Sequence, residues 1–223
     1  MIMTLIVLNF KTYRESTGPE ALALARICQE MALEHSLEMV VVPQVADIST
    51  IAAAVSIPVF SQHVDGVGYG GFTGHITAAS LKASGAAGSL INHSERRLRL
   101  AEIEASIAAC RQAGLKSIVC TNNVATTRAA AAMGPDYVAI EPPELIGSGI
   151  PVSKSDPEIV ANSVKAVKRI APDVGVLCGA GITHGEDLKA ALDLGSQGVL
   201  LASGIIKAKD QRKALQDLVA GAR

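Results

Sequence analysis

The sequence predicts an α/β protein folded as a single (β/α)8 barrel. Short β-branched apolar runs recur along the chain, and segments of helical periodicity separate them. Successive runs begin about 28 residues apart, the size of one strand-and-helix unit. No linker rich in proline or glycine interrupts this repeat, so we expect residues 1–223 to form one domain. Its length of 223 residues is slightly below the roughly 250 residues usual for this barrel.

The eight apolar runs are expected to form buried parallel strands, because each is apolar at consecutive positions and therefore on both faces. The alternative fold is a doubly wound open sheet, which would favour a G-x-G-x-x-G turn after the first strand. Asn9-Phe10-Lys11 stands there instead. The expected strands are residues 5–8, 39–42, 57–60, 87–91, 117–120, 137–140, 174–177 and 198–201.

The segments between the strands carry ordinary helix signals. Pro19 occupies a first helical turn, and Asp156 precedes Pro157 as a capping residue. Gly114 and Gly134 stand where helices are expected to end. The expected helices are residues 19–33, 95–113, 123–133, 157–170, 186–194 and 210–220.

The composition excludes several classes of protein. Hydrophobic residues make up 49% and aromatic residues 3%, so the core must be aliphatic, and the net charge of −1 argues against nucleic acid or an anionic membrane as a partner. No run approaches the length of a membrane helix, and the start of the chain does not resemble a signal peptide, so we expect a cytoplasmic protein. We expect no disulfide framework and no zinc site, because no C-x-x-C pair occurs among Cys28, Cys110, Cys120 and Cys178.

Polar and titratable residues follow three of the expected strands. In a barrel, chemistry is carried by residues at the carboxyl ends of the strands. Small residues follow the last two strands, where barrels often bind phosphate through backbone N–H groups. The polar set is Asn9, Lys11, Asn92, His93, Glu95 and Glu141, and the small set is Gly181, Ala202 and Ser203.

Glu141 is the candidate catalytic base. It directly follows the strand at 137–140, and Pro142-Pro143 stiffens the exit from that strand. Gly147-Ser148-Gly149 then provides a hinge for a flap at 142–149. A base on a rigid strand beneath a mobile flap suits acid–base chemistry on a small molecule. The alternative is that Glu141 only begins a surface loop.

His93 and Lys11 are the candidate electrophiles. A helix opening at Ser94–Arg97 should favour a neutral imidazole at His93. Lys11 can stabilise a developing oxyanion or form a Schiff base with a carbonyl substrate. Cys120 is expected to pack behind Glu141 rather than act as a nucleophile.

The glycine-rich stretch at 66–74 exposes Tyr69 and Phe72, two of the few aromatic residues in the chain. Apolar side chains at the tip of a loop need a pocket to bury them, and a second copy of the chain is the expected source. The alternative is that the loop folds back onto its own barrel.

Four motifs in order resemble those of the triosephosphate isomerase family, in its short archaeal branch. The likeness covers nearly the whole chain. It implies a TIM barrel that interconverts D-glyceraldehyde 3-phosphate and dihydroxyacetone phosphate without a cofactor, in glycolysis and gluconeogenesis. The motifs are Asn9-Phe10-Lys11, Asn92-His93-Ser94-Glu95-Arg96, Ala139-Ile140-Glu141-Pro142 and Ile146-Gly147-Ser148-Gly149.

The resemblance also implies residue roles and an assembly. Glu141 would be the base, with His93 and Lys11 as electrophiles, Asn9 as a binding contact and Glu95 paired with Lys11. Family members pair through the glycine-rich loop, whose Thr73 reaches towards the partner's active site, and archaeal forms are often homotetramers. The substrate-binding residues would be Asn9, Phe10, Lys11, Ile146, Gly147, Gly181, Ala202 and Ser203.

The sequence departs from the commoner family pattern at three places. Glu144 stands where the flap usually has tryptophan, and Ala202-Ser203 replaces two glycines. Cys178 and Gly181 replace a tyrosine and a serine whose hydroxyl groups hold the flap closed. Two other functions remain open: a lyase or aldolase that uses Lys11 as a Schiff base, and a barrel that binds phosphate without catalysis.

Overall fold

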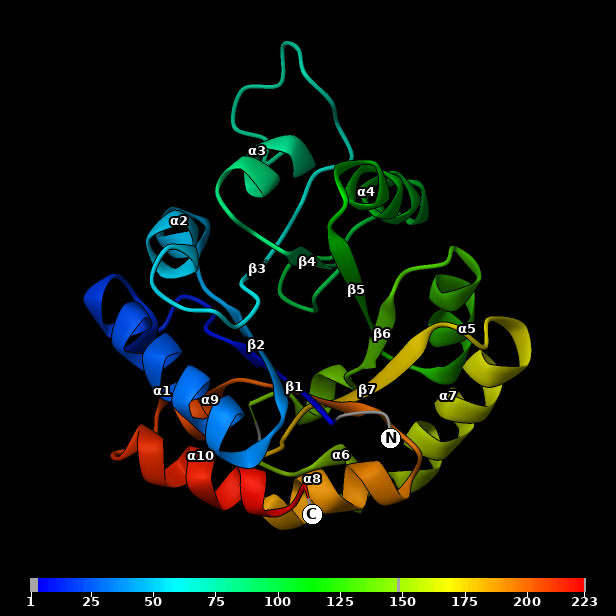
Figure 1. Ribbon diagram of the computed structural model, residues 1–223. Helices are drawn as coiled ribbons and strands as arrows, with labels where there is room; N and C mark the ends of the chain where they lie inside the picture. The colour runs from blue at the N-terminus through cyan, green and yellow to red at the C-terminus, as the bar shows by residue number, and fades with distance from the viewer. Residues whose placement is uncertain (1–3, 148, 223) are drawn as a thin grey trace.

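The computed structural model describes residues 4–147 and 149–222, and it contains eight parallel strands arranged as a barrel (Figure 1). The hydrogen-bonded order is β2-β1-β8-β7-β6-β5-β4-β3. A single bridge between Val41 and Val59 brings β2 beside β3 and nearly closes the ring. The strands are β1 (Leu5–Asn9), β2 (Glu38–Val42), β3 (Phe60–Ser61), β4 (Gly88–Ile91), β5 (Lys116–Thr121), β6 (Tyr137–Ile140), β7 (Gly175–Gly179) and β8 (Gly198–Leu201).

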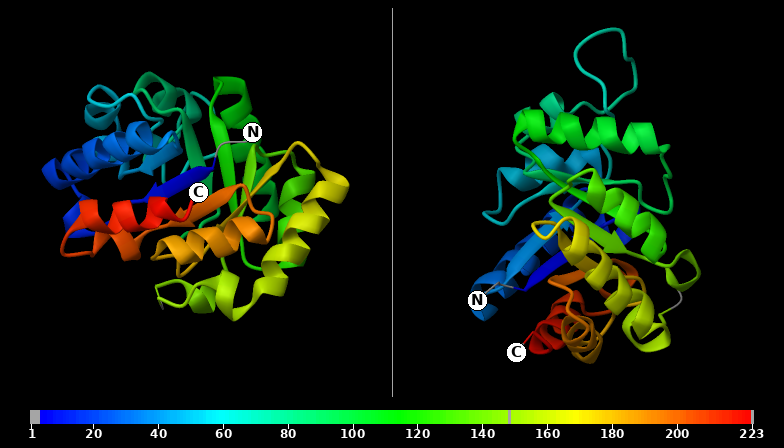
Figure 2. Two further views of the ribbon diagram at one scale, coloured as in Figure 1. Left: turned by 60° about the horizontal axis from the view of Figure 1, so that its bottom comes forward. Right: turned by 90° about the vertical axis from the view of Figure 1, so that its right-hand side faces the viewer.

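Helices surround the strands on the outside, as both views in Figure 2 show. This confirms the predicted α/β barrel. The long helices are α1 (Pro19–His35), α4 (Leu100–Ala113), α5 (Val124–Ala132), α7 (Pro157–Ile170), α8 (Gly185–Asp193) and α10 (Gln211–Ala220). The short ones are α2 (Ile48–Ala52), α3 (Ala78–Ala83), α6 (Val152–Ser155) and α9 (Ser203–Ile206), with 3-10 turns η1 (Arg14–Ser16), η2 (Val45–Asp47) and η3 (Pro143–Leu145).

Two of the predicted elements begin more than two residues from their predicted start; the other predicted boundaries differ by two residues or fewer. The third strand is Phe60–Ser61 rather than 57–60, because Pro58 has no N–H to donate to a strand ladder. Helix α4 begins at Leu100 rather than at residue 95, where the second expected helix was placed. Asn92 accepts a hydrogen bond from the N–H of Leu98 (2.8 Å), so the intervening residues form a turn rather than a helix.

The core has two layers, because successive side chains of a strand point to opposite faces. Val7 and Leu200 belong to the layer inside the barrel, whereas Ile6 and Leu8 pack between the strands and the helices. Side chains of both layers are aliphatic for the most part. The barrel therefore presents rigid strand ends on which a site can be built.

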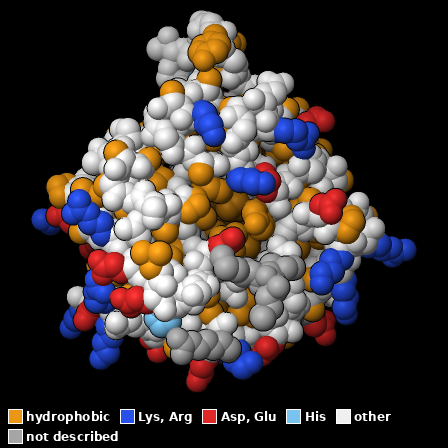
Figure 3. Space-filling view, viewed as in Figure 1, with side chains coloured by type: hydrophobic (Ala, Val, Ile, Leu, Met, Phe, Trp, Pro, Cys, Tyr) orange, Lys and Arg blue, Asp and Glu red, His pale blue; other side chains and the backbone are white. Residues whose placement is uncertain are grey.

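The amino-terminal end of the barrel carries an apolar hollow of about 520 Å³ (Figure 3). Leu5, Met39, Phe60 and Ile118 contribute to its wall. The polar residues singled out in the sequence lie at the opposite ends of the strands. None of the helices in the described ranges is long and apolar enough to cross a membrane.

The glycine-rich loop at 66–74 projects away from the barrel, at the top of Figure 1 and of the right-hand view in Figure 2. Tyr69 is 91% exposed at its tip, and Phe72 is 43% exposed. The loop does not fold back onto its own barrel, so the alternative of an intramolecular docking is wrong for this chain.

Asp210 caps the last helix, α10, and its removal gives a first testable result. Its Oδ1 accepts the N–H of Lys213 (2.9 Å) at the start of that helix. Asp210→Ala is expected to lower the free energy of unfolding by about 1 kcal/mol. The melting temperature should fall by about 2–4 °C. Asp210→Asn retains an acceptor oxygen and should melt within about 1 °C of the parent; equal losses in both variants would contradict a capping role.

Candidate active site

The carboxyl ends of β1, β4 and β6 bring together the polar residues that the sequence singled out. Asn9 ends β1, and Lys11 lies just beyond it; His93 follows β4 and Glu141 follows β6. All four line one cavity. The enclosed part of the cavity measures about 40 Å³, and the space measures about 440 Å³ when its open mouth is included. The wall is completed by Ile146, Gly147, Gly149, Ala180, Gly181, Ile182, Thr183, Leu200, Leu201, Ala202, Ser203 and Gly204.

Glu141 is held rigidly and is buried, with 6% exposure. Its backbone N–H donates to Thr121 (2.8 Å), which continues the strand pairing one residue past β6. Oε2 of its side chain has no hydrogen-bond partner among the described residues and lies 3.7 Å from Nε2 of His93. A buried carboxylate oxygen without a partner is costly, so such an atom marks a site that a ligand is expected to complete.

Two cysteine thiols lie beside Glu141. Burial and the charge of Glu141 raise the pKa of Cys178 to about 12. Burial, together with the charge of Glu141 and a hydrogen bond to it, also raises the pKa of Cys120 well above its ordinary value. A thiol held protonated is a poor nucleophile. This supports the interpretation that Cys120 packs behind Glu141.

The thiols should therefore react only when the protein unfolds. Burial raises the pKa of Cys110 to about 12 as well, and Cys28 is fully buried. With a pKa near 12, about one thiol in 10⁴ is ionised at pH 8. We expect Ellman's reagent at pH 8 to modify the native protein at least about 100-fold more slowly than the protein in guanidinium. Rapid modification of one native thiol would contradict this.

His93 is positioned by Asn92, a residue for which the sequence gave no role. Asn92 has a left-handed backbone (φ 62°). Its amide donates to the carbonyl of Cys120 (2.9 Å) and accepts from Leu98 (2.8 Å). Asparagine tolerates this conformation better than most residues. In the sequence Asn92 stood out only as a polar residue after the fourth strand, next to His93.

His93 stands in a turn rather than at a helix end. The helix predicted at Ser94–Arg97 is absent, so the argument from a helix end does not apply to this ring. The N–H of Glu95 lies 3.3 Å from Nδ1 of His93, and Oε2 of Glu95 lies 3.5 Å from the same nitrogen. Nε2, the other ring nitrogen, faces Oε2 of Glu141 at 3.7 Å.

Lys11 lies in the cavity and pairs with Glu95, Nζ to Oε1, at 3.0 Å. Its side chain is 11% exposed, and its backbone is left-handed (φ 49°). Asn9 accepts the N–H of Lys11 (3.0 Å), and the amide of Gln62 donates to the carbonyl of Lys11 (2.7 Å). Gln62 is a second supporting residue to which the sequence gave no role, because the bond joins residues 51 positions apart.

The segment that carries the expected flap reaches the cavity with Ile146 and Gly147, and Ser148 lies outside the described residues. Beyond it, the N–H of Val152 donates to the carbonyl of Ala180 (3.3 Å). Gly181 (φ 73°) allows the two segments to approach, because a Cβ there would lie 1.9 Å from the carbonyl oxygen of Ile150.

Phe10 does not join the other expected substrate contacts. Its side chain is fully buried in the aliphatic core and does not line the cavity. The N–H of Phe10 still pairs with Val42 (3.0 Å), so its side chain keeps the alternation of β1 and points outward to the helices. The Phe10 side chain therefore does not face the cavity, and the predicted role of Phe10 in substrate binding stays a prediction.

The barrel and its cavity suit one class of protein, an enzyme that carries out acid–base chemistry on a small molecule. Glu141 places a buried carboxylate in the cavity, and a histidine and a lysine lie beside it. Among the described residues, no three His, Cys, Asp or Glu side chains are placed to hold a metal ion.

Comparisons with known proteins give the family. The family model for triosephosphate isomerase matches residues 4–220. The triosephosphate isomerase of Methanosarcina barkeri is 62% identical over 219 residues, covering 98% of this chain and 99% of that protein. The enzymes of Methanosarcina mazei (63% identical, 96% of each chain) and Methanocaldococcus jannaschii (54%, covering 96% of this chain and 98% of that one) are also similar. The chain therefore belongs to the triosephosphate isomerase family and is an isomerase.

A solved structure supports the same fold. The crystal structure of triosephosphate isomerase from Bartonella henselae superposes with a TM-score of 0.78 and covers 98% of this chain and 100% of that chain. The two sequences are 22% identical, so this comparison bears on the fold alone. The resemblance noted in the sequence is thus confirmed at the level of family and fold.

Proposed function

We propose that this enzyme interconverts D-glyceraldehyde 3-phosphate and dihydroxyacetone phosphate through an enediolate, and that it serves glycolysis and gluconeogenesis in the cytoplasm. The observation that carries the proposal is the buried Oε2 of Glu141, which lacks a hydrogen-bond partner in the described part of the chain and faces Nε2 of His93 at 3.7 Å. A carbon acid bound between these two atoms would meet a base on one side and a proton donor on the other.

In this mechanism Glu141 takes the proton from the carbon next to the carbonyl and returns it to the neighbouring carbon. His93 donates a hydrogen bond from Nε2 to the carbonyl oxygen, and the charge of Lys11 stabilises the oxygen that becomes negative. Nε2 then gives its proton to that oxygen and takes the proton of the neighbouring hydroxyl, so that carbonyl and hydroxyl exchange places and the imidazole returns to its starting state. A neutral imidazole suits this role, and triosephosphate isomerase is itself the standard example of that pairing. Asn9 accepts a hydrogen bond from the backbone N–H of Lys11, and Glu95 pairs with the ammonium group of Lys11.

The phosphate is expected to meet backbone N–H groups at the other end of the cavity. Ile146, Gly147, Gly181, Ala202 and Ser203 line that part of its wall. Loops after the seventh and eighth strands are a common phosphate site in barrels. The segment at 142–149 would then act as the flap that excludes water from the enediolate.

A coupled assay tests the reaction directly. Glyceraldehyde 3-phosphate is supplied, and dihydroxyacetone phosphate is reduced by a glycerol-phosphate dehydrogenase with NADH. We expect turnover without any added cofactor, and incorporation of solvent deuterium at carbon. A barrel that binds phosphate but does not catalyse would bind inorganic phosphate and show neither signal.

A lyase or aldolase that uses Lys11 as a Schiff base is the second candidate. The ammonium of Lys11 lies 3.0 Å from the carboxylate of Glu95, and a paired ammonium is a weak nucleophile. This favours the isomerase. Borohydride in the presence of dihydroxyacetone phosphate should leave Lys11 unmodified, and a stable adduct on it would favour the lyase.

We also propose that residues 1–223 act as one catalytic domain that assembles as a homodimer through the loop at 66–74, with two dimers forming a tetramer. The exposure of Tyr69 (91%) and Phe72 (43%) supports a partner at that loop. Tyr69→Asp and Phe72→Asp together should lower the molar mass measured by light scattering by at least half. An unchanged mass would place the interface elsewhere.

A further inference from the structure

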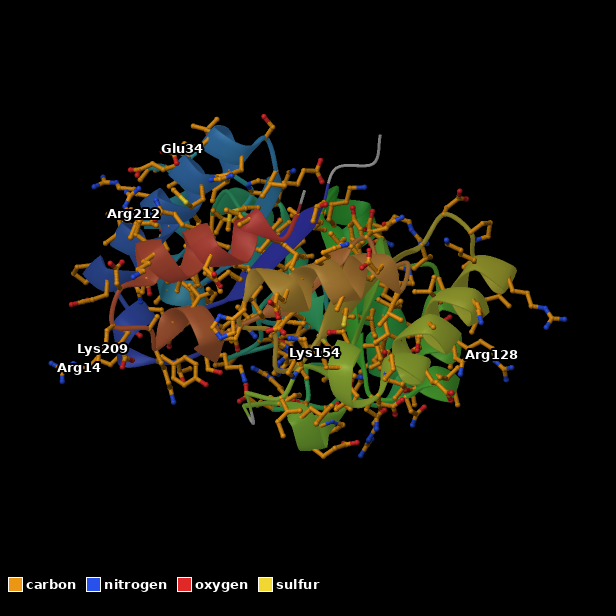
Figure 4. The ribbon with its side chains drawn as sticks, turned by 90° about the horizontal axis from the view of Figure 1, so that it is seen from below. Arg14, Glu34, Arg128, Lys154, Lys209 and Arg212 are labelled. Carbon is orange, nitrogen blue, oxygen red and sulfur yellow. The ribbon has the colours of Figure 1, made fainter. Side chains whose placement is uncertain are left out.

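An ion pair links α6, the short helix after the expected flap, to the first turn of α8, the helix that follows β7. Nζ of Lys154, in α6, lies 2.7 Å from Oδ1 of Asp187, in α8. The Asp187 side chain is only 3% exposed, whereas that of Lys154 is 49% exposed. Figure 4 shows Lys154 beside α8. A second carboxylate, Glu186, lies 3.6 Å from the same ammonium but is 90% exposed, so it is the weaker partner.

The other oxygen of Asp187 organises the loop that enters α8. Oδ2 accepts the N–H groups of Thr183 and His184, each at 3.0 Å. The hydroxyl of Thr183 in turn donates to the carbonyl of Gly181 (3.2 Å). Gly181, Ile182 and Thr183 all line the active-site cavity. Asp187 therefore fixes part of the cavity wall without lying in the cavity.

The backbone around Lys154 also contacts the loop after β7. The N–H of Val152 donates to the carbonyl of Ala180 in that loop (3.3 Å). Within its own segment, the N–H of Lys154 donates to the carbonyl of Pro151 (3.0 Å). Ile150 lies so close to Gly181 that no Cβ would fit at position 181. The ion pair thus joins two segments that already touch beside the cavity.

The charge of Lys154 stabilises the charged form of Asp187. Burial raises the pKa of Asp187, but the Lys154 ammonium and the N–H groups of His184 and Thr183 outweigh it, so the pKa lies below its ordinary value. Removing one partner of a pair leaves the buried charge uncompensated. The loop would then shift to bring water to Asp187.

We propose that Lys154 and Asp187 are positioning residues for the phosphate end of the site, where their ion pair holds the loop Gly181–Thr183 against the segment that precedes α6. This inference rests on the proposed function. It assigns the pair a role in binding the phosphate and none in moving a proton. The loss should therefore appear in KM and in the affinity for phosphate analogues rather than in kcat.

Steady-state kinetics of Lys154→Met test this role. We expect KM for glyceraldehyde 3-phosphate and Ki for 2-phosphoglycolate to rise roughly tenfold, because a small displacement of a binding group is enough for such a loss. The change in kcat should stay below about threefold. Asp187→Asn keeps an acceptor for the N–H groups but loses the charge, and should give a rise of similar size.

Two further variants serve as controls. Lys154→Arg restores a cation and should return KM and Ki to within about threefold of the parent. Lys189→Met removes an exposed lysine of α8 that pairs only with Asp193 (3.1 Å) among the ion pairs of the described chain, and it should change neither constant. Melting temperatures separate a loss of folded protein from a loss of affinity.

The outcomes separate this inference from the proposed function. If the parent enzyme isomerises the triose phosphates and Lys154→Met keeps the parent's KM and Ki, the positioning role alone is overturned. Losses confined to kcat, or no rescue by Lys154→Arg, also overturn it. A parent that does not isomerise overturns the proposed function, and the inference with it.

Discussion

Glu141→Gln is expected to lower kcat by about 10³- to 10⁴-fold while the barrel stays folded. Glutamine has nearly the shape of glutamate, but its amide cannot accept the substrate proton. The buried Oε2 of Glu141 has no partner among the described residues, so the carboxylate costs stability when the site is empty. The glutamine variant should therefore melt at the same temperature as the parent or slightly higher.

The measurement combines the coupled assay with deuterium exchange and thermal unfolding. Both the isomerisation and the exchange at carbon should fall together, because both need the same proton transfer. Glu144→Gln is the matched control, since Glu144 is exposed three residues further along the same segment. It should retain at least about half of the parent's kcat, as changes to exposed charges usually do. A Glu141→Gln enzyme with near-normal turnover would remove Glu141 from the mechanism.

Gly179→Ala is expected to lower kcat/KM by about 100-fold, the second-largest effect. A Cβ at Gly179 would lie 2.4 Å from Cγ of Glu141 and 3.0 Å from its Oε1. The backbone of Gly179 cannot retreat, because it pairs with Leu200 in the barrel. Glu141 must give way instead, and a displacement of about 1 Å at a catalytic group is enough for a loss of this size.

The neighbouring variant Ala180→Gly is the control for Gly179→Ala. Ala180 has a left-handed backbone (φ 74°), so glycine relieves strain and adds no atom to the cavity. We expect its free energy of unfolding to stay within about 1 kcal/mol of the parent, and its kcat/KM within about threefold. If Gly179→Ala proved as active as Ala180→Gly, the position of Glu141 would not depend on the absence of a side chain at 179.

Much of the site was visible in the sequence because a barrel gathers the ends of its strands. Lys11, His93 and Glu141 lie in the sequence directly after apolar runs, and strand ends meet at one rim. The prediction that these residues lie together needed only the repeat and its period. Their roles in the reaction stay predictions until the variants are measured.

The supporting contacts were not visible, because each joins positions that no local pattern connects. Gln62 reaches Lys11 across 51 positions, and Lys154 reaches Asp187 in a different helix. The family resemblance placed Phe10 among the substrate contacts, and only the structure showed that the alternation of β1 turns its side chain into the core.

The sequence by itself determined the eight-unit repeat, the aliphatic core and the set of polar residues at the strand ends, since hydrophobic periodicity is a local property of the chain. Only the tertiary structure decided which atoms have partners. It left Oε2 of Glu141 without one, placed Gly179 against that side chain and paired Lys154 with a buried carboxylate. Such pairings depend on distances between separate elements, and those distances exist only once the barrel has closed.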